Sequence, residues 1–153
     1  MSFKLKSSSW QSTQKIARLF AQTILEKKPR SQGALVLGLM GELGSGKTTF
    51  IRGFIKSFGI KKRITSPTFL IMRKFFSASQ KCYLYHFDFY RSSSRKDLKI
   101  LEFDKIIKNP QNIVLIEWAE KIKNLLPKNA IWLTFQHGKE INQRLILIKT
   151  KNK

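Results

Sequence analysis

A glycine-rich segment at residues 41–48 carries the clearest chemical pattern in the chain. Its sequence, GELGSGKT, fits G-x-x-x-x-G-K-[ST] at every fixed position. In this pattern the backbone N–H groups of the loop surround phosphate oxygens, and the lysine reaches the β- and γ-phosphates. The last hydroxyl binds Mg²⁺. The segment therefore predicts a nucleoside triphosphate site in which Lys47 contacts the phosphates and Thr48 contacts the metal.

The segments on either side of this loop fit the same interpretation. Residues 34–40 form a continuous apolar run without alternation, which is typical of a strand buried on both faces. Residues 48–58 place apolar side chains at helical spacing, and Gly59 is expected to end that helix. The loop would then lead from a buried strand into a helix whose N-terminal end favours anions.

A second acidic motif lies farther along the chain. The apolar tetrad at 113–116 ends in Glu117, which is the pattern of a strand that delivers a carboxylate beside a phosphate loop. Together with the loop, it predicts that Glu117 holds the metal or positions water. Trp118, directly after it, is expected to pack against the loop.

The third motif is HFDFYR at residues 86–91, which follows a predicted strand at 82–87. Strand alternation places His86 and Asp88 on one face. Asp88 is expected to assist the metal without binding it directly, or to orient a water. A single histidine on a strand is more often structural than catalytic. Arg91 could neutralise phosphate charge or pair with Asp88.

The polar turn at 65–69, TSPTF, precedes a predicted strand. Such a turn is either an ordinary loop or a segment that senses the γ-phosphate. In the second case, contact with the phosphate would order the turn and hydrolysis would release it.

The other apolar patterns divide the chain into alternating strands and helices. Phe3 and Leu5 alternate with polar residues, as in a short edge strand. Ser12 or Thr13 is expected to cap a helix that ends near residues 26–28. Further strands are predicted at 69–76, 82–87, 130–135 and 145–148, and helical segments at 92–107 and 119–126. The alternation predicts one α/β domain over residues 1–153.

Composition narrows the class of protein. The 30 basic and 9 acidic side chains give a formal charge of +21, which either attracts polyanions or reflects a lysine-rich composition. The single cysteine, Cys82, excludes an intrachain disulfide and a four-cysteine zinc site, and it favours a reducing, cytoplasmic setting. The apolar runs are too short to span a bilayer, and no apolar signal segment is visible.

Four motifs, taken in order, resemble those of the TsaE family: GELGSGKTT (41–49), SPTF (66–69), HFDFYR (86–91) and IEW (116–118). This family consists of bacterial P-loop ATPases that support synthesis of N6-threonylcarbamoyladenosine in tRNA. The resemblance runs from about Ser9 to Arg144. It implies a P-loop NTPase-like three-layer sandwich with a mostly parallel central sheet.

The resemblance also implies cofactors and partners. ATP and Mg²⁺ are the expected cofactors, and TsaD and TsaB the expected protein partners. TsaD transfers the threonylcarbamoyl group, and the ATPase resets or drives the complex between turnovers. The tRNA is expected to act indirectly or at the surface of the complex. Neither a membrane nor DNA is an expected partner.

Carried over by position, the resemblance assigns individual residues. Lys47, Asp88 and Glu117 are the expected catalytic residues, and Thr48 and Glu117 the expected Mg²⁺ ligands. Ser9 and Thr13 match a Ser-x-x-x-Thr motif near the adenine, although Ser12 stands where the family usually has Glu. The phosphates are expected to contact Glu42, Leu43, Gly44, Ser45, Gly46, Lys47, Thr48 and Thr49. The pair Leu101-Glu102 replaces a usual Leu-Gly, outside every catalytic motif.

Three other classes of protein share part of this pattern or of the basic composition. A small-molecule P-loop kinase would use the same loop and Glu117, but it usually needs an arginine-bearing lid that is not visible here. A GTPase would need N-K-x-D and D-x-x-G motifs, which the sequence lacks. A basic RNA-binding module would show an RRM, KH or dsRBD signature, and none is present.

Overall fold

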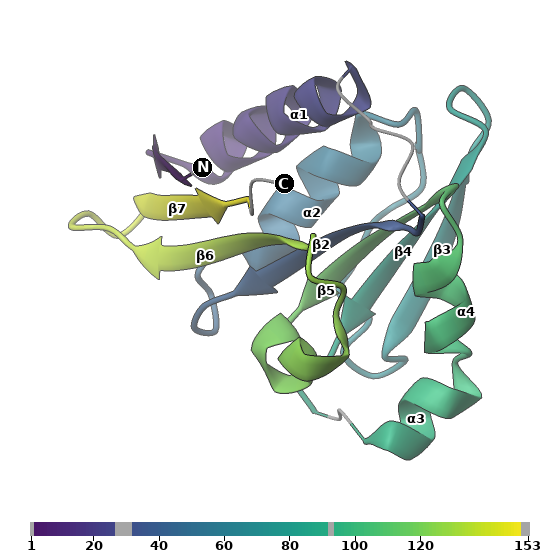
Figure 1. Cartoon of the computed structure of the whole chain (residues 1–153). Coiled ribbons are helices and arrows are strands. Elements are labelled where there is room, and N and C mark those ends of the chain that lie inside the picture. The colour runs from purple at the N-terminus through teal and green to yellow at the C-terminus, as the bar shows by residue number, and fades with distance from the viewer. Residues whose placement is uncertain (1, 27–31, 92–93, 151–153) are drawn as a thin grey trace.

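The computed structural model describes residues 2–26, 32–91 and 94–150 and consists of a seven-stranded sheet with helices on both faces (Figure 1). The strands are β1 (Ser2–Ser7), β2 (Leu35–Met40), β3 (Met72–Ser77), β4 (Cys82–Asp88), β5 (Asn112–Glu117), β6 (Ile131–His137) and β7 (Arg144–Lys149). The helices are α1 (Trp10–Glu26), α2 (Lys47–Lys56), α3 (Arg95–Ile100), α4 (Phe103–Lys108) and the 3₁₀ helix η1 (Ala119–Leu125).

The sheet has the strand order β1-β7-β6-β2-β5-β4-β3. Its four middle strands, β6, β2, β5 and β4, are parallel, and the outer strands are antiparallel to their neighbours. The short connections of β3 to β4 and of β6 to β7 allow only antiparallel pairing, whereas the parallel strands are joined through helices. The predicted α/β fold with a mostly parallel central sheet is confirmed.

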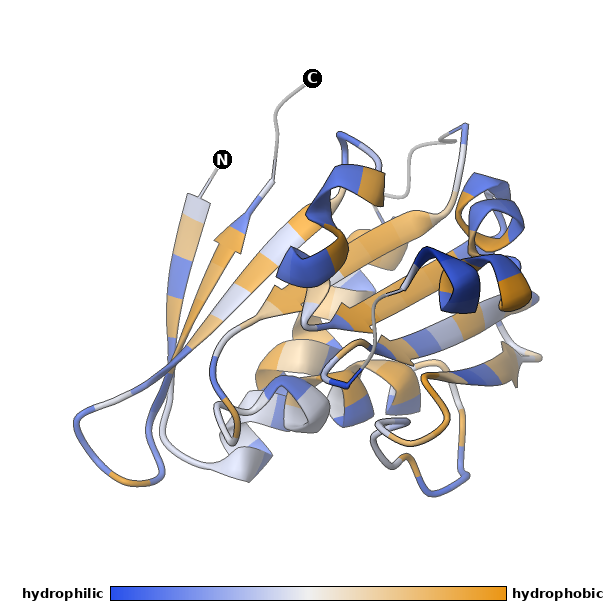
Figure 2. Cartoon of the chain, turned by 90° about the horizontal axis from the view of Figure 1, so that it is seen from below, coloured by the Kyte–Doolittle hydropathy of each residue, from blue (hydrophilic) through white to orange (hydrophobic). Residues whose placement is uncertain are grey.

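Two apolar cores, one on each face of the sheet, make the three layers. Alternate residues of β2 and β5 point into different cores: Leu37 and Leu115 pack beneath α1 and α2, while Val36 and Val114 pack beneath α3, α4 and η1. The middle strands are therefore apolar on both sides, and most of their residues have hydrophobic colours in Figure 2. This explains why residues 34–40 lack alternation.

The parallel pairing brings the glycine-rich loop, the HFDFYR motif and Glu117 to the same end of the sheet, where the carboxyl ends of the middle strands lie. Glu117, the last residue of β5, lies opposite Asp88 of β4 on one side and Leu39 of β2 on the other. The glycine-rich loop leaves β2 at the same edge. Such an edge, where the carboxyl ends of parallel strands meet, is the usual place for a ligand site in α/β proteins.

The start of the first helix differs from the prediction. α1 begins at Trp10, and the cap is Ser9, not Ser12 or Thr13. The Ser9 Oγ accepts a hydrogen bond from the Ser12 backbone N–H at 3.1 Å, and the Thr13 N–H donates to the Ser9 carbonyl at 3.0 Å. Ser12 and Thr13 therefore occupy the first turn that the cap stabilises.

Three further elements differ in extent or type. The helical stretch at 92–107 is two helices, α3 and α4, because Glu102 adopts a left-handed φ of 52° between them; residues 92 and 93 lie outside the described part. β3 begins at Met72, since the Ile71 N–H bonds the Pro67 carbonyl in a turn. The segment at 119–126 is the 3₁₀ helix η1.

Over residues 2–26, 32–91 and 94–150, no helix has the length and apolar content needed to cross a membrane.

We predict that Gly53→Ala destabilises the protein. Gly53 lies where α2 crosses α1, and a Cβ there would stand 2.6 Å from the Gln14 carbonyl oxygen and 2.7 Å from its Cα. Helix propensity alone favours alanine by about 1 kcal/mol. Overpacking against a backbone costs roughly 1–3 kcal/mol, so the free energy of unfolding should fall by about 1 kcal/mol. Urea unfolding measures this change.

The control is Thr23→Ala, on the exposed side of α1. This substitution adds no atoms to the α1–α2 contact and should change the free energy of unfolding by no more than about 0.5 kcal/mol. If Gly53→Ala were as stable as the original chain or more so, helix propensity would outweigh the contact and the tight packing of α1 on α2 would be refuted.

Candidate functional site

The site is built around the loop between β2 and α2. Gly41, Gly44 and Gly46 have positive φ values of 136°, 74° and 103°. Glycine adopts this conformation without the strain that a Cβ would cause. A Cβ on Gly41 would also lie 2.3 Å from the Phe135 carbonyl oxygen of β6. Left-handed residues in such a loop allow successive N–H groups to converge on an anion.

The side chain of Lys47 lies folded over this loop. Its Nζ donates to the carbonyl oxygens of Gly41 at 2.6 Å and Glu42 at 2.8 Å, and it stands 4.1 Å from the centre of the Trp118 ring. Burial lowers the pKa of Lys47 from its ordinary value, while Glu117, Glu120 and Asp88 act in the opposite direction through their charge. Among the described residues Lys47 has no ion pair, so an anion bound by the loop would be its natural partner.

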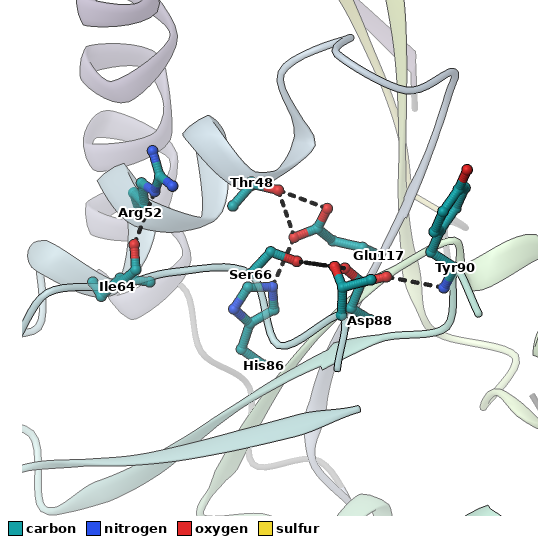
Figure 3. A network of polar contacts seen from close by, with 9 residues as sticks. Thr48, Arg52, Ile64, Ser66, His86, Asp88, Tyr90 and Glu117 are labelled. Carbon is teal, nitrogen blue, oxygen red and sulfur yellow. Dashed lines mark hydrogen bonds and ion pairs between the residues drawn. The ribbon is translucent and has the colours of Figure 1, made fainter. Parts of the chain in front are cut away.

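The Glu117 carboxylate joins the loop helix to the sheet (Figure 3). The Thr48 hydroxyl lies 2.9 Å from its Oε1 and 2.8 Å from its Oε2 and shares its one hydrogen between them. The His86 Nε2 lies 2.8 Å from Oε1 on the other side. Glu117 is only 3% exposed, so these donors satisfy a carboxylate that burial would otherwise make costly. The hydroxyl and the carboxylate together offer oxygen ligands at one point.

Asp88, at the end of β4, binds the turn at 66–68. The hydroxyls of Ser66 and Thr68 both donate to its Oδ2, the latter at 2.7 Å, and the Tyr90 N–H donates to its Oδ1 at 2.9 Å (Figure 3). Among the described residues no ion pair joins Asp88 to Arg91, whose guanidinium lies 4.3 Å from the centre of the Phe69 ring. Asp88 therefore organises the polar turn.

These groups surround one pocket of about 300 Å³. It is lined by Leu43, Gly44, Ser45, Gly46, Lys47, Thr48, Thr49, Ser66, Thr68, Asp88, Tyr90, Glu117 and Trp118. The structure thus brings together every residue predicted for catalysis, for the metal and for the phosphates, except that Glu42 contributes its carbonyl to Lys47 without lining the pocket.

Ser9 and Thr13, predicted to lie near the adenine, do not line this pocket. The buried Thr13 hydroxyl lies 2.7 Å from the Ser7 Oγ and donates to the Ser9 carbonyl at 3.2 Å. Ser7 faces Arg144 across β1 and β7, and the Arg144 Nη2 donates to the Gly44 carbonyl at 3.2 Å. Arg144 therefore connects β7 to the loop, while the described hydrogen bonds of Ser9 and Thr13 stabilise the start of α1.

Two contacts at the site were missed by sequence reasoning. Arg144 carries no local pattern that marks it, because its approach to the loop depends on the β6–β7 hairpin. A single histidine on a strand favours a structural role, although alternation already predicts His86 on the same face as Asp88. Its contact with Glu117 depends on the pairing of β4 with β5.

The donor set fits Mg²⁺ better than a metal held by protein ligands alone. In the described ranges no cluster of three or more His, Cys, Asp or Glu side chains is arranged to hold a metal ion. Mg²⁺ at phosphate sites needs only one or two protein ligands, since phosphate and water supply the rest. The Thr48 hydroxyl and the Glu117 carboxylate match that requirement.

Comparisons with known proteins identify the family. The family model described as "Threonylcarbamoyl adenosine biosynthesis protein TsaE" matches residues 7–146. Proteins named "tRNA threonylcarbamoyladenosine biosynthesis protein TsaE" are similar to this chain in Rickettsia prowazekii (36% identity, 95% of this chain and 93% of the relative) and in Bacillus subtilis (32%, 77% and 72%). The crystal structure of Bacillus subtilis YdiB superposes with a TM-score of 0.76 at 26% identity, over 98% of this chain and 86% of that one. The chain belongs to the TsaE family of threonylcarbamoyl adenosine biosynthesis proteins.

Proposed function

We propose that this protein binds and hydrolyses ATP with Mg²⁺. It acts with TsaD and TsaB as an accessory subunit in formation of the threonylcarbamoyl group on the adenosine next to the anticodon of tRNA. The observation that carries the proposal is the convergence of Lys47, Thr48, Glu117 and Asp88 on one pocket at the glycine-rich loop. The relatives' names supply the tRNA modification.

Each side chain has a part in this proposal that follows from its position. The loop and Lys47 hold the phosphates, and Thr48 and Glu117 hold Mg²⁺ directly or through water. Mg²⁺ held there would supply positive charge that neutralises the negative charge developing on the phosphates. The carboxylate of Asp88 already accepts three hydrogen bonds, so its part is to hold the turn at 66–68 against the pocket.

The kinase alternative receives no support from this pocket. A kinase of that class closes arginine side chains over the phosphates, and none of the described residues that line the pocket is an arginine. The turn held by Asp88 is better suited to report the nucleotide state than to bind a second substrate.

Apolar side chains around the pocket support a protein partner that responds to nucleotide. Leu43 and Tyr90 line the pocket yet are 70% and 43% exposed, and Phe69 and Leu70, directly after Thr68, are 79% and 62% exposed. We call these four residues the apolar rim. Exposed apolar side chains that gather at one place mark interaction surfaces. TsaD and TsaB are the proposed occupants of this surface.

The first test concerns Lys47. We expect Lys47→Ala to abolish measurable ATP turnover and greatly weaken nucleotide binding, because it removes the cation that folds over the loop. Lys47→Arg should not restore turnover, since a planar guanidinium does not replace a compact ammonium. Steady-state phosphate release and nucleotide titration measure both. Lys56→Ala, at the exposed end of α2, is the control. Undiminished turnover in Lys47→Ala would remove the ATPase proposal.

A second test separates the two carboxylates. Glu117→Ala should lose Mg²⁺-dependent hydrolysis while ATP still binds through the loop. Asp88→Ala should also slow hydrolysis, with a smaller effect on Mg²⁺ affinity, because Asp88 holds the turn and not the Thr48 hydroxyl. Mg²⁺ titrations of the nucleotide complexes give the affinities.

Asp104→Ala, an exposed acid on α4, is the control for the loss of one negative charge. Equal Mg²⁺ affinity in the original chain and in Glu117→Ala would refute the metal assignment. A larger loss of Mg²⁺ affinity in Asp88→Ala than in Glu117→Ala would reverse the two assignments.

The third test asks what hydrolysis does. The protein should bind the TsaB–TsaD pair more tightly with a non-hydrolysable ATP analogue than with ADP. The reason is that Ser66 and Thr68, in the turn that leads into the apolar rim, line the pocket in which a γ-phosphate would lie. Coupling of this kind is typically about 5- to 150-fold in affinity. Affinities measured at two salt concentrations separate this difference from the contribution of the +21 charge, which should not depend on nucleotide.

Phe69→Ala should weaken partner binding, whereas Phe76→Ala, which removes an equally large exposed ring from β3, should not. Identical affinities in the two nucleotide states would overturn the proposed switch even if ATP hydrolysis itself were observed.

A further inference from the structure

A buried histidine lies against the carboxylate proposed for the metal. His86 has an exposed fraction of 0%, and its Nε2 lies 2.8 Å from Glu117 Oε1 (Figure 3). The other ring nitrogen, Nδ1, is also buried and has no hydrogen-bond partner in the described part of the chain. The Glu117 contact is thus the one hydrogen bond that this ring makes there.

The strand register explains how the ring reaches Glu117. His86 lies opposite Leu115 on β5, and Asp88, two residues on, lies opposite Glu117. The imidazole therefore bridges diagonally from one strand to the carboxylate of the next, a separation that long side chains on one face can span. It approaches Glu117 from the neighbouring strand β4, while Thr48 approaches from α2.

The chemistry of the contact fixes the direction of the hydrogen bond. An ionised carboxylate only accepts hydrogen bonds, so the His86 Nε2 must carry the hydrogen and donate it to Oε1. Thr48 shares its one hydrogen between the two oxygens. Oε1 therefore contacts both His86 and Thr48, whereas Oε2 contacts Thr48 alone among the described residues. Oε2 thus keeps a lone pair that is free to bind a cation in the pocket.

We propose that His86 is a positioning residue: its Nε2–H fixes the Glu117 carboxylate so that Oε2 and the Thr48 hydroxyl present their oxygens together to Mg²⁺. The inference rests on the proposed function and adds the residue that orients the ligand. A histidine that served only to fill the core would be replaceable by an apolar side chain without effect on the metal. Groups that orient a metal ligand typically change metal affinity by roughly 10- to 100-fold when they are replaced.

The test measures how strongly Mg²⁺ enhances nucleotide binding. The affinity for a non-hydrolysable ATP analogue is determined by calorimetry with saturating Mg²⁺ and with EDTA, and the ratio of the two gives the enhancement. His86→Leu should lower the enhancement roughly 10- to 100-fold and leave the affinity in EDTA unchanged, because the loop and Lys47 are intact. His86→Gln keeps an N–H donor and should restore most of the enhancement.

The matched control is Tyr85→Leu, which removes a buried ring from the same strand but on the opposite face. It should retain the full enhancement even if it lowers the melting temperature. Absence of any Mg²⁺ enhancement in the original chain would contradict the proposed function itself. Full enhancement in the original chain and an equal enhancement in His86→Leu would overturn the positioning role alone.

A spectroscopic measurement keeps the inference testable if His86→Leu does not fold. The chain has only two histidines, so ring ¹⁵N NMR of the original protein, assigned with a His137→Gln variant, identifies the His86 nitrogens. The expected result is a hydrogen on Nε2. A His86 ring whose Nε2 lacks hydrogen could not donate to Glu117, and that result would overturn the inference.

Discussion

The contact between Thr48 and Glu117 is the constraint on which the rest of the site depends. It joins side chains 69 positions apart in sequence, one in the first turn of α2 and one at the end of β5. Glu117 is buried, and a buried carboxylate is unfavourable unless donors surround it. The sheet must therefore bring β4 beside β5, and the loop must turn α2 toward them, before the carboxylate is satisfied. The same contacts that stabilise the carboxylate also place the Thr48 hydroxyl and Glu117 together, as the proposed metal site requires.

The site contains buried acidic side chains, although the chain as a whole is strongly basic. The chain carries a formal charge of +21, yet two of its nine acids, Glu117 and Asp88, are buried around one pocket. Among the described residues, hydroxyls, backbone N–H groups or an imidazole hold each carboxylate, and no lysine or arginine pairs with either. Lys47, the cation beside them, donates to loop carbonyls instead. Because no lysine or arginine in the described part of the chain pairs with Glu117, Lys47 remains suited to an anion and Glu117 to a cation.

Local sequence patterns predicted the parts of the fold that depend on neighbours in sequence. The apolar run of β2, the glycines of the loop, the spacing in α2 and the tetrad of β5 each require only a few consecutive residues. The start of α1 was misplaced because Ser9, Ser12 and Thr13 are all competent caps and tertiary contacts decide among them. The break before α4 was missed because Glu102 adopts a conformation that its residue type does not favour. The contacts of His86 and Arg144 follow from strand order, which no local pattern encodes.

A short series of hydrogen bonds links Glu117, the proposed metal ligand, to the apolar rim. The Phe89 N–H donates to the Glu117 carbonyl at 3.1 Å, and the Asp88 N–H donates to the Ile71 carbonyl at 2.9 Å. The hydroxyls of Ser66 and Thr68 complete the connection through the Asp88 side chain. A hydrogen bond to a charged group contributes about 1.5–3 kcal/mol. Allosteric coupling typically amounts to about 1–3 kcal/mol, which is the same range. Loss or gain of the Ser66 or the Thr68 hydrogen bond to Asp88 with nucleotide state would therefore be large enough to alter the affinity of a partner proposed to bind the rim. The turn therefore needs no large rearrangement to act as the connection.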